Sequence, residues 1–398
     1  YGIILKNLGK LKEAEFYLKK AIKINPNIAS IYLNLGAVLK DLGKSKEAEK
    51  VTRKCIEINP KNAIAYMNLG NILNSLDKQK EALSCYLKAI RISPHESLIL
   101  ETIPIFLRDS NPSQLNGYEI VKILEILLGK ENVYHNDLFK VFNALFKDKL
   151  IIKKDDLGRV ILDKEFINNK ILVKGLKMIL LRNLKWEQFL TRLRKYFCTK
   201  IAAQNESLNI NEKNFIIALA EQCFLNEYVF TQSKEEKESI EKIELSLYKE
   251  SINSVKISLL ACYKPLYKLI NIIPFIKTYS SDNTNFNKLL KLVLSEPLQE
   301  RKLSTEIKKL GLIKDKTSIE VKNQYEESPY PRWKNCNTKV NNKISAIEKI
   351  NNQIKPNYIK PKLFNSTKKV DVLVAGCGTG EHLFHILDYS NAHFTGID

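Results

Sequence analysis

The chain has 398 residues, of which 44% are hydrophobic, and its formal net charge is +20. This length and hydrophobic content predict a soluble globular protein of two or three domains. No run of about 18 uncharged apolar residues is present, so no transmembrane helix is predicted. The seven cysteines contain no C-x-x-C pair, which favours a reducing, cytoplasmic location and argues against a zinc or other metal site.

The positive charge raises the question of a nucleic-acid partner, because clustered cations gain affinity by releasing phosphate counterions. However, only 9 of the 64 basic residues are arginine, and the lysines are spread along the chain. Specific readers of phosphates and bases rely on bidentate arginine. We therefore expect a solvated lysine-rich surface and no nucleic-acid partner.

The densest basic stretch runs from Leu180 to Phe197. Its apolar residues recur at helical spacing and predict a buried stripe made of Leu184, Phe189, Leu193 and Phe197. Its basic residues are predicted to face solvent: Arg192, Arg194 and Lys195.

The first hundred residues repeat with a step of 34. The residues that keep this step are Pro26, Pro60 and Pro94, Gly2, Gly36 and Gly70, and Ala14, Ala48 and Ala82. Glycine and alanine allow two helices to approach, and proline ends the second helix of each unit. In this register residues 1–96 resemble about three tetratricopeptide repeats. The first is incomplete, so we expect further repeats before Tyr1.

The resemblance implies an α-helical solenoid whose concave groove binds a protein or peptide. Asn34 and Asn68 occupy equivalent positions in successive units. They resemble the asparagine ladder of the tetratricopeptide superhelix in protein O-GlcNAc transferases, in which side-chain amides can bond an extended peptide backbone. The alternative is that both are simply polar groove residues.

Residues 97–320 have apolar residues at helical spacing with few glycines and prolines, and they predict an all-α middle domain. Cys223 lies beside Glu221 and Glu227, but no histidine lies within twenty residues and neighbouring acids raise a thiol pKa. A buried helix is therefore favoured over a nucleophile.

Residues 321–369 are interpreted as a proline- and aromatic-rich segment followed by a polar linker. Its aromatic and charged residues suggest a pocket lid: Tyr325, Glu326, Tyr330, Arg332 and Trp333. An interdomain connector that docks on a neighbour is the alternative.

Residues 370–398 predict the first β-α-β of a doubly wound sheet, with a buried strand at Val370–Ala375, a glycine turn, a helix and a second strand at Ala392–Ile397. A P-loop is excluded because Glu381 and His382 follow the last glycine. The spacing also departs from a dinucleotide fingerprint, and the Glu381 carboxylate would compete with a pyrophosphate for the helix N-terminus.

The stretch "VLVAGCGTG" resembles motif I of class I S-adenosylmethionine-dependent methyltransferases, and "FTGID" resembles the end of their second strand. The resemblance implies a Rossmann-like domain that is truncated here. It implies S-adenosyl-L-methionine as the cofactor, with Asp398 on the ribose and a loop lining the cofactor made of Gly376, Cys377, Gly378, Thr379 and Gly380. One departure is Val374, where such families usually carry an acid.

The order of these parts is similar to that of bacterial repeat-containing methyltransferases. We therefore expect a methyltransferase whose repeats recruit a protein substrate. Residues that select the methyl acceptor normally lie beyond the second strand, so no catalytic residue is named. Two alternatives remain: a non-catalytic tetratricopeptide scaffold with a degenerate cofactor site and, less favoured by the loop spacing, an NAD-dependent oxidoreductase.

Overall fold

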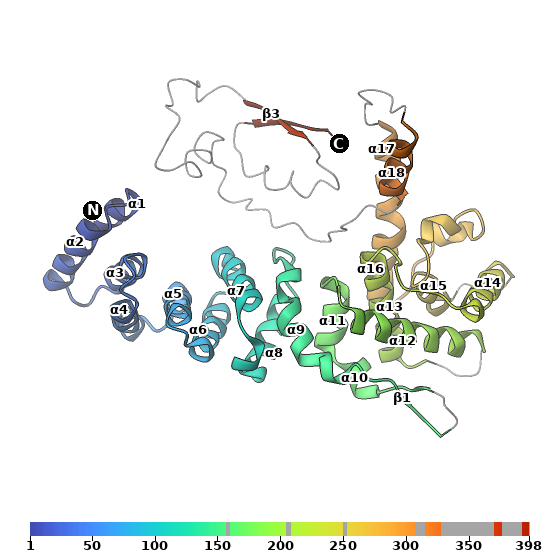
Figure 1. Cartoon of the computed structure of the whole chain (residues 1–398), viewed down its shortest axis with the longest axis horizontal. Helices are drawn as coiled ribbons and strands as arrows, with labels where there is room; N and C mark the ends of the chain where they lie inside the picture. Colours follow the sequence, from blue (N-terminus) through green and yellow to red (C-terminus); the bar gives the residue numbers. More distant parts are fainter. Residues whose placement is uncertain are drawn as a thin grey trace. The chain divides into compact units, whose positions relative to one another are not determined.

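A computed structural model describes residues 1–156, 160–203, 208–249, 253–306, 315–327, 370–375 and 392–397. Most of these residues are helical (Figure 1). The chain divides into two compact units, Tyr1–Leu145 and Phe146–Asp398. The sequence places the end of the repeats at residue 96, and the helices from there to residue 145 belong to the same unit as the repeats. No helix among the described residues is long and apolar enough to cross a bilayer.

The first unit is built from helices throughout (blue to green in Figure 1). In chain order these are α1 (Gly2–Asn7), α2 (Leu11–Ile24), α3 (Ala29–Asp41), α4 (Ser45–Ile58), α5 (Ala63–Ser75), α6 (Gln79–Ile92), α7 (Ser97–Asp109), the 3-10 turn η1 (Pro112–Gln114), α8 (Gly117–Leu127), the 3-10 turn η2 (His135–Leu138) and α9 (Phe139–Phe146). Helices α1 and α2, α3 and α4, and α5 and α6 pack in pairs, and each pair packs on the next.

The glycines that recur once per repeat lie where the two helices of a pair touch. A Cβ atom added at Gly70 would lie 2.8 Å from the ring of Tyr86, and one added at Gly36 would collide with the hydroxyl of Thr52. Such distances are too short for a real contact, so only glycine allows this approach. The packing role predicted for these glycines is confirmed.

The ends of the helices also follow the repeat. Each turn between the two helices of a pair contains a residue with positive φ: Gly9 at 76°, Gly43 at 77° and Asp77 at 59°. Glycine adopts this conformation without strain, whereas Asp77 is one of the few other residue types that tolerate it. Helix α4 ends at Ile58, shortly before Pro60, so the predicted helix-ending role of proline is confirmed.

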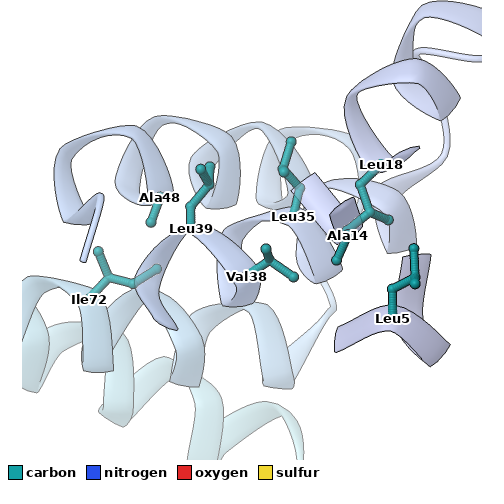
Figure 2. Close-up of a cluster of buried hydrophobic side chains, with 8 residues drawn as sticks. All are labelled: Leu5, Ala14, Leu18, Leu35, Val38, Leu39, Ala48 and Ile72. Atoms are coloured by element: carbon teal, nitrogen blue, oxygen red, sulfur yellow. The ribbon is translucent and has the colours of Figure 1, made fainter. Parts of the chain in front are cut away.

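The core of the stack is continuous across successive pairs (Figure 2). A single cluster of buried side chains draws on five helices, α1 to α5. Its members are Leu5, Ala14, Leu18, Leu35, Val38, Leu39, Ala48 and Ile72. Each helix pair thus covers the apolar face of its neighbour, which is how a repeat too small for its own core becomes stable.

The second unit is mainly helical, with a small hairpin that the all-α prediction for residues 97–320 missed. Its strands β1 (Lys153–Lys154) and β2 (Val160–Ile161) pair antiparallel. Its remaining elements up to Glu327 are η3 (Lys147–Lys149), α10 (Lys164–Asn168), α11 (Lys170–Met178), α12 (Leu184–Ala202), α13 (Ile210–Leu225), α14 (Lys234–Lys249), α15 (Ser254–Leu260), η4 (Leu266–Leu269), η5 (Pro274–Lys277), α16 (Thr284–Leu290), the π-helical η6 (Lys291–Ser295), α17 (Glu296–Glu306) and α18 (Lys316–Glu327).

Helix α13 forms the centre of this unit. It contacts α10, α11, α12, α15 and α16, and its residues from Phe215 to Leu225 are all buried. A helix that is apolar around most of its circumference must be enclosed by others. Cys223 is completely buried within it, and Glu221 pairs with Lys177 at 3.3 Å. The interpretation of this stretch as a buried helix is confirmed.

Asparagine begins many helices of this unit. In each case the side-chain oxygen accepts a hydrogen bond from a backbone N–H of the first turn, which otherwise lacks a partner. The capping residues are Asn169 for α11, Asn183 for α12, Asn209 for α13, Asn253 for α15 and Asn283 for α16. The asparagine-rich composition therefore has a local structural use.

The prediction for α12 was wrong at two positions. Arg194 is 0% exposed and lies among the buried residues of the helix, whereas Leu184 is 66% exposed. The Arg194 guanidinium donates to the backbone oxygens of Phe230 and Thr231 and pairs with Glu236 at 3.5 Å. It is also stacked on the ring of Tyr263, 4.2 Å from the centroid. The Glu236 carboxylate compensates the buried charge, and the backbone oxygens satisfy further N–H groups. The helical spacing of the sequence did not predict these partners.

Two strands close the described chain. Strands β3 (Val370–Ala375) and β4 (Ala392–Ile397) have the predicted bounds and pair in parallel. The predicted burial of β3 is wrong, since Leu373 is 63% exposed. A parallel strand is buried only inside a wider sheet covered on both faces, and the described sheet has two strands.

Candidate protein-binding face of the helical repeats

The first helices of successive pairs, α3 and α5, present matching stripes of accessible residues, and α7 continues the pattern. On each helix the stripe follows the spacing i, i+4, i+7 and i+11. We call these three stripes the first-helix face. Its residues are Ser30, Asn34, Ala37 and Asp41 on α3, Ile64, Asn68, Asn71 and Ser75 on α5, and Leu98, Thr102, Ile105 and Asp109 on α7, all half-buried or exposed.

The first helices of neighbouring repeats lie next to one another. Helix α3 contacts α5, and α5 contacts α7. The three stripes therefore belong to adjacent helices of one layer.

Charge is divided unequally between the two layers of helices. Helix α5 contains no charged residue, and the charges of α3 are confined to Lys40 and Asp41 at its end. Helix α4, in contrast, has the sequence SKEAEKVTRKCIEI and alternates charges of both signs. The first-helix face thus consists mainly of uncharged residues, and its two charged members, Asp41 and Asp109, are acidic although the whole chain carries +20.

The two predicted groove residues both lie on this face. The Nδ2 atom of Asn34 donates to the backbone oxygen of Ser30 at 2.7 Å, which leaves its Oδ1 oxygen as an acceptor. Thr102 makes the equivalent bond to Leu98, also at 2.7 Å. No hydrogen bond of the Asn68 side chain to the described residues is found, so its amide is available to a ligand. The structure brings Asn34 and Asn68 onto one face, and whether they bind a peptide stays a prediction.

Helix α7 contributes residues to this face that were not predicted from the sequence. This helix begins one repeat length after α5, and its residues Thr102 and Ile105 are the repeat equivalents of Asn68 and Asn71. The repeat step itself was the available signal, but the next unit lacks a regular second helix and Pro104 replaces the recurrent glycine. Leu98 and Ile105 are each 47% exposed, so α7 makes its end of the face apolar.

Ion pairs between second helices hold neighbouring repeats together. The Glu15 carboxylate accepts from Lys19 at 2.6 Å and from Lys44, in the next repeat, at 2.8 Å. Glu49 is the equivalent residue one repeat later, and it accepts from Lys78 at 3.1 Å. The hydrogen bonds from Lys19 and Lys44 lower the pKa of Glu15, so it is ionised at neutral pH. These pairs add polar links between neighbouring repeats to the contacts of the apolar core.

All five described cysteines are buried. Burial raises the pKa of Cys85 to about 11, and it also raises the pKa of Cys55 and Cys198 above the ordinary value. A thiol must be ionised to act as a nucleophile or a metal ligand. These cysteines therefore serve packing.

The other predicted site residues fall at the edge of the described chain or outside it. Tyr325 and Glu326 belong to α18, which ends at Glu327, shortly before Pro329. The remaining lid candidates, Tyr330, Arg332 and Trp333, lie outside the described residues. So do all members of the predicted cofactor site: Gly376, Cys377, Gly378, Thr379, Gly380 and Asp398.

Three of the solved structures with some likeness to the chain are the following. A MamA double mutant is 24% identical, and the match covers 31% of this chain and 70% of that one, with a TM-score of 0.27. Pseudomonas aeruginosa pilF is 17% identical over 64% of this chain and 90% of its own, with a TM-score of 0.29. The C-terminal part of a TPR repeat-containing protein from Cytophaga hutchinsonii is 16% identical over 73% and 98%, with a TM-score of 0.30.

A search of curated protein sequences finds no match. Family models of the tetratricopeptide repeat match residues 1–28, 29–62 and 63–96. The matched ranges have the predicted register and the bounds of the helix pairs. These comparisons give no support to the methyltransferase domain that the sequence resembles. Residues 1–96 of the chain are tetratricopeptide repeats.

Proposed function

We propose that the chain is a protein-interaction scaffold whose repeats bind a partner protein or peptide across the first-helix face. The observation that carries this proposal is the continuity of the face. Accessible, mainly uncharged stripes recur on α3, α5 and α7 within a strongly basic chain. Repeat stacks use such surfaces to hold extended segments.

The composition of the face favours a segment recognised through its backbone and apolar side chains. Asn34, Asn68 and Thr102 offer neutral hydrogen-bonding groups in one row, and Leu98 and Ile105 offer apolar contact beside them. Amide groups can pair with the N–H and C=O groups of an extended peptide. Apolar side chains that become buried in an interface supply much of the binding free energy.

The test is affinity capture with the full chain, followed by quantification of the captured proteins. We expect the double variant Asn68→Ala and Ile105→Asp to reduce capture of the specific partner about tenfold, since hot-spot residues contribute more than about 1 kcal/mol. The matched control is Lys20→Ala with Lys50→Asp on the second helices, where capture stays unchanged. Equal capture by both double variants would reject the first-helix face as the binding surface.

A second candidate is methyl transfer from S-adenosylmethionine, and the pairing of β3 with β4 favours it. Ala375 and Ile397 are register partners at the carboxyl ends of parallel strands, so the glycine loop and Asp398 both start from one edge of the pair. Gly376, Gly378 and Gly380 would approach the cofactor, and Asp398 would accept from its ribose hydroxyls. The cofactor itself would supply the methyl group from its sulfonium.

This second proposal is tested by calorimetric titration of S-adenosylmethionine, with NAD as the control ligand. We expect binding of S-adenosylmethionine to the protein that weakens at least tenfold in Asp398→Ala, because two hydroxyl contacts are lost. Preference for NAD would indicate an oxidoreductase. Binding of neither ligand would remove the support for a cofactor site in residues 370–398.

A further inference from the structure

A pocket of about 750 Å³ lies in the second unit, beside the end of α13. One wall is the segment that leads into α12, and a second is the turn at residues 226–230 that follows α13. Val321 and Gln324 of α18 line it as well. The volume falls in the range of sites for small molecules. None of the functions considered above uses this pocket.

The turn at residues 226–230 is held in an unusual conformation. Glu227 and Tyr228 both have positive φ, 55° and 57°, although neither is glycine. They end α13 through hydrogen bonds from Tyr228 N to Cys223 O and from Glu227 N to Phe224 O. Glycine usually occupies such a cap. Backbone strain of this kind is concentrated at functional sites, because the surrounding structure must hold it in place.

The same turn contains an enclosed polar group without a partner. Neither the nitrogen nor the oxygen of the Asn226 amide makes a hydrogen bond within the described structure. Buried amides are nearly always satisfied, and an unsatisfied one indicates a missing water, ion or ligand. Asn226 lines the pocket, so the strained backbone and the unsatisfied amide lie in the same wall.

The rim of the pocket is apolar. Leu184 on one wall and Val229 on the other are 66% and 60% exposed, and Phe230 lies buried behind them. Large apolar side chains exposed on both sides of a pocket offer contact to an apolar ligand. They also show that the pocket is open to solvent.

Carboxylates outnumber cations among the described residues that line the pocket. Glu187 lies in the first turn of α12 and is half-buried, and Glu227 lines the opposite wall. Arg182 is the one cation among the described lining residues, and its side chain is exposed. An excess of negative charge in a recess of low polarity attracts a cation more strongly than it would in water.

We propose that this pocket binds a small organic cation, a molecule with an apolar body and a single amino or guanidinium group. The apolar body contacts Leu184 and Val229, and the charged group pairs with Glu187. The proposal does not depend on the function of the repeats.

The experiment uses the full chain and three probes of equal length: hexylamine, hexanol and hexanoate. Dissociation constants are measured by ligand-observed NMR at pH 7, where hexylamine is a cation and hexanoate an anion. We expect hexylamine to bind about fivefold more tightly than hexanol, as a partly exposed ion pair contributes up to about 1 kcal/mol. Hexanoate should bind most weakly.

Two variants of lining residues and one control variant locate the binding. Glu187→Gln should abolish the preference for hexylamine over hexanol, whereas Glu241→Gln, an exposed position on α14, should leave it unchanged. Leu184→Ala should weaken the binding of all three probes to a similar extent. Because the Leu184 side chain is exposed, this substitution should not impair folding. The proposal is overturned if none of the probes binds, if the three bind equally, or if Glu187→Gln retains the preference.

Discussion

The repeat helices and the helices of the second unit are held together by different kinds of contact. In the repeats, Gly36 and Gly70 let helices touch closely, and partly exposed pairs such as Glu15 with Lys44 link each repeat to the next. In the second unit, helices surround α13, and the charged pair of Arg194 and Glu236 is fully enclosed.

The difference shows where each unit is vulnerable. A repeat contacts only its neighbours, so its stability is a sum of similar local terms. In the second unit a few buried groups each connect several elements. Tyr263, for example, donates to Glu236 at 2.7 Å and stacks on Arg194, and burial raises its pKa so that its hydroxyl remains a donor.

The largest expected effect comes from breaking the buried pair. Arg194→Met should destabilise the protein by about 3–5 kcal/mol, because Glu236 would be left as an uncompensated buried charge. Arg192→Met, on the exposed side of α12, should change the free energy of unfolding by less than about 0.5 kcal/mol. Urea denaturation measures both, and similar values for the two variants would contradict the buried network.

A smaller effect is expected within the repeats. Gly70→Ala should destabilise by about 1–3 kcal/mol, because the added methyl group would overlap the Tyr86 ring. Gly117→Ala is the matched control, since a Cβ there meets no atom within 4 Å, and it should be neutral or stabilise by up to about 1 kcal/mol. Thermal unfolding measures the stability of both variants. An unchanged stability of Gly70→Ala would mean that the two helices of that pair are not packed so closely.

The smallest effect on stability concerns the ion pairs between repeats. Glu15→Gln should destabilise by about 1 kcal/mol or less at neutral pH. The pKa of Glu15 is lowered in the folded state, so its contribution is present above the ordinary glutamate pKa and is lost as the pH falls through the lowered value.

The difference between wild type and Glu15→Gln should therefore shrink on acidification, as measured by urea denaturation at several pH values. Glu57→Gln provides the control, since Glu57 is an exposed residue that pairs with Lys54 of its own helix, and it should show little difference at any pH. A difference between wild type and Glu15→Gln that is constant with pH would show that the Glu15 carboxylate does not hold the repeats together.

Periodicity explains how much of this fold could be predicted. The repeat step predicted the helix pairs and the role of Gly70, and it placed Asn34 and Asn68 on one face. Helix α7 also follows the repeat step, but Pro104 stands where the earlier repeats have glycine, so the sequence did not indicate a further repeat. The bounds of β3 and β4 followed from their apolar, β-branched runs, whereas their burial depends on elements far away in the chain.

No such repetition guides the second unit. The burial of Arg194 is determined by Glu236 and by backbone oxygens of a later segment of the chain. The spacing of apolar residues along α12 does not indicate these partners. The pocket beside α13 likewise depends on a turn in which Glu227 and Tyr228 adopt a conformation that their residue types do not predict. Non-local contacts of this kind require the structure.

The central claim is that the first-helix face of the repeats binds a protein. The most direct test is photo-crosslinking in cells with the full chain, with benzoylphenylalanine placed either at Asn68 on this face or at Lys54 on the second helix α4. We expect a discrete crosslinked partner with the probe at position 68 and none with the probe at position 54. Crosslinking at position 54 alone, or at neither position, would contradict the claim.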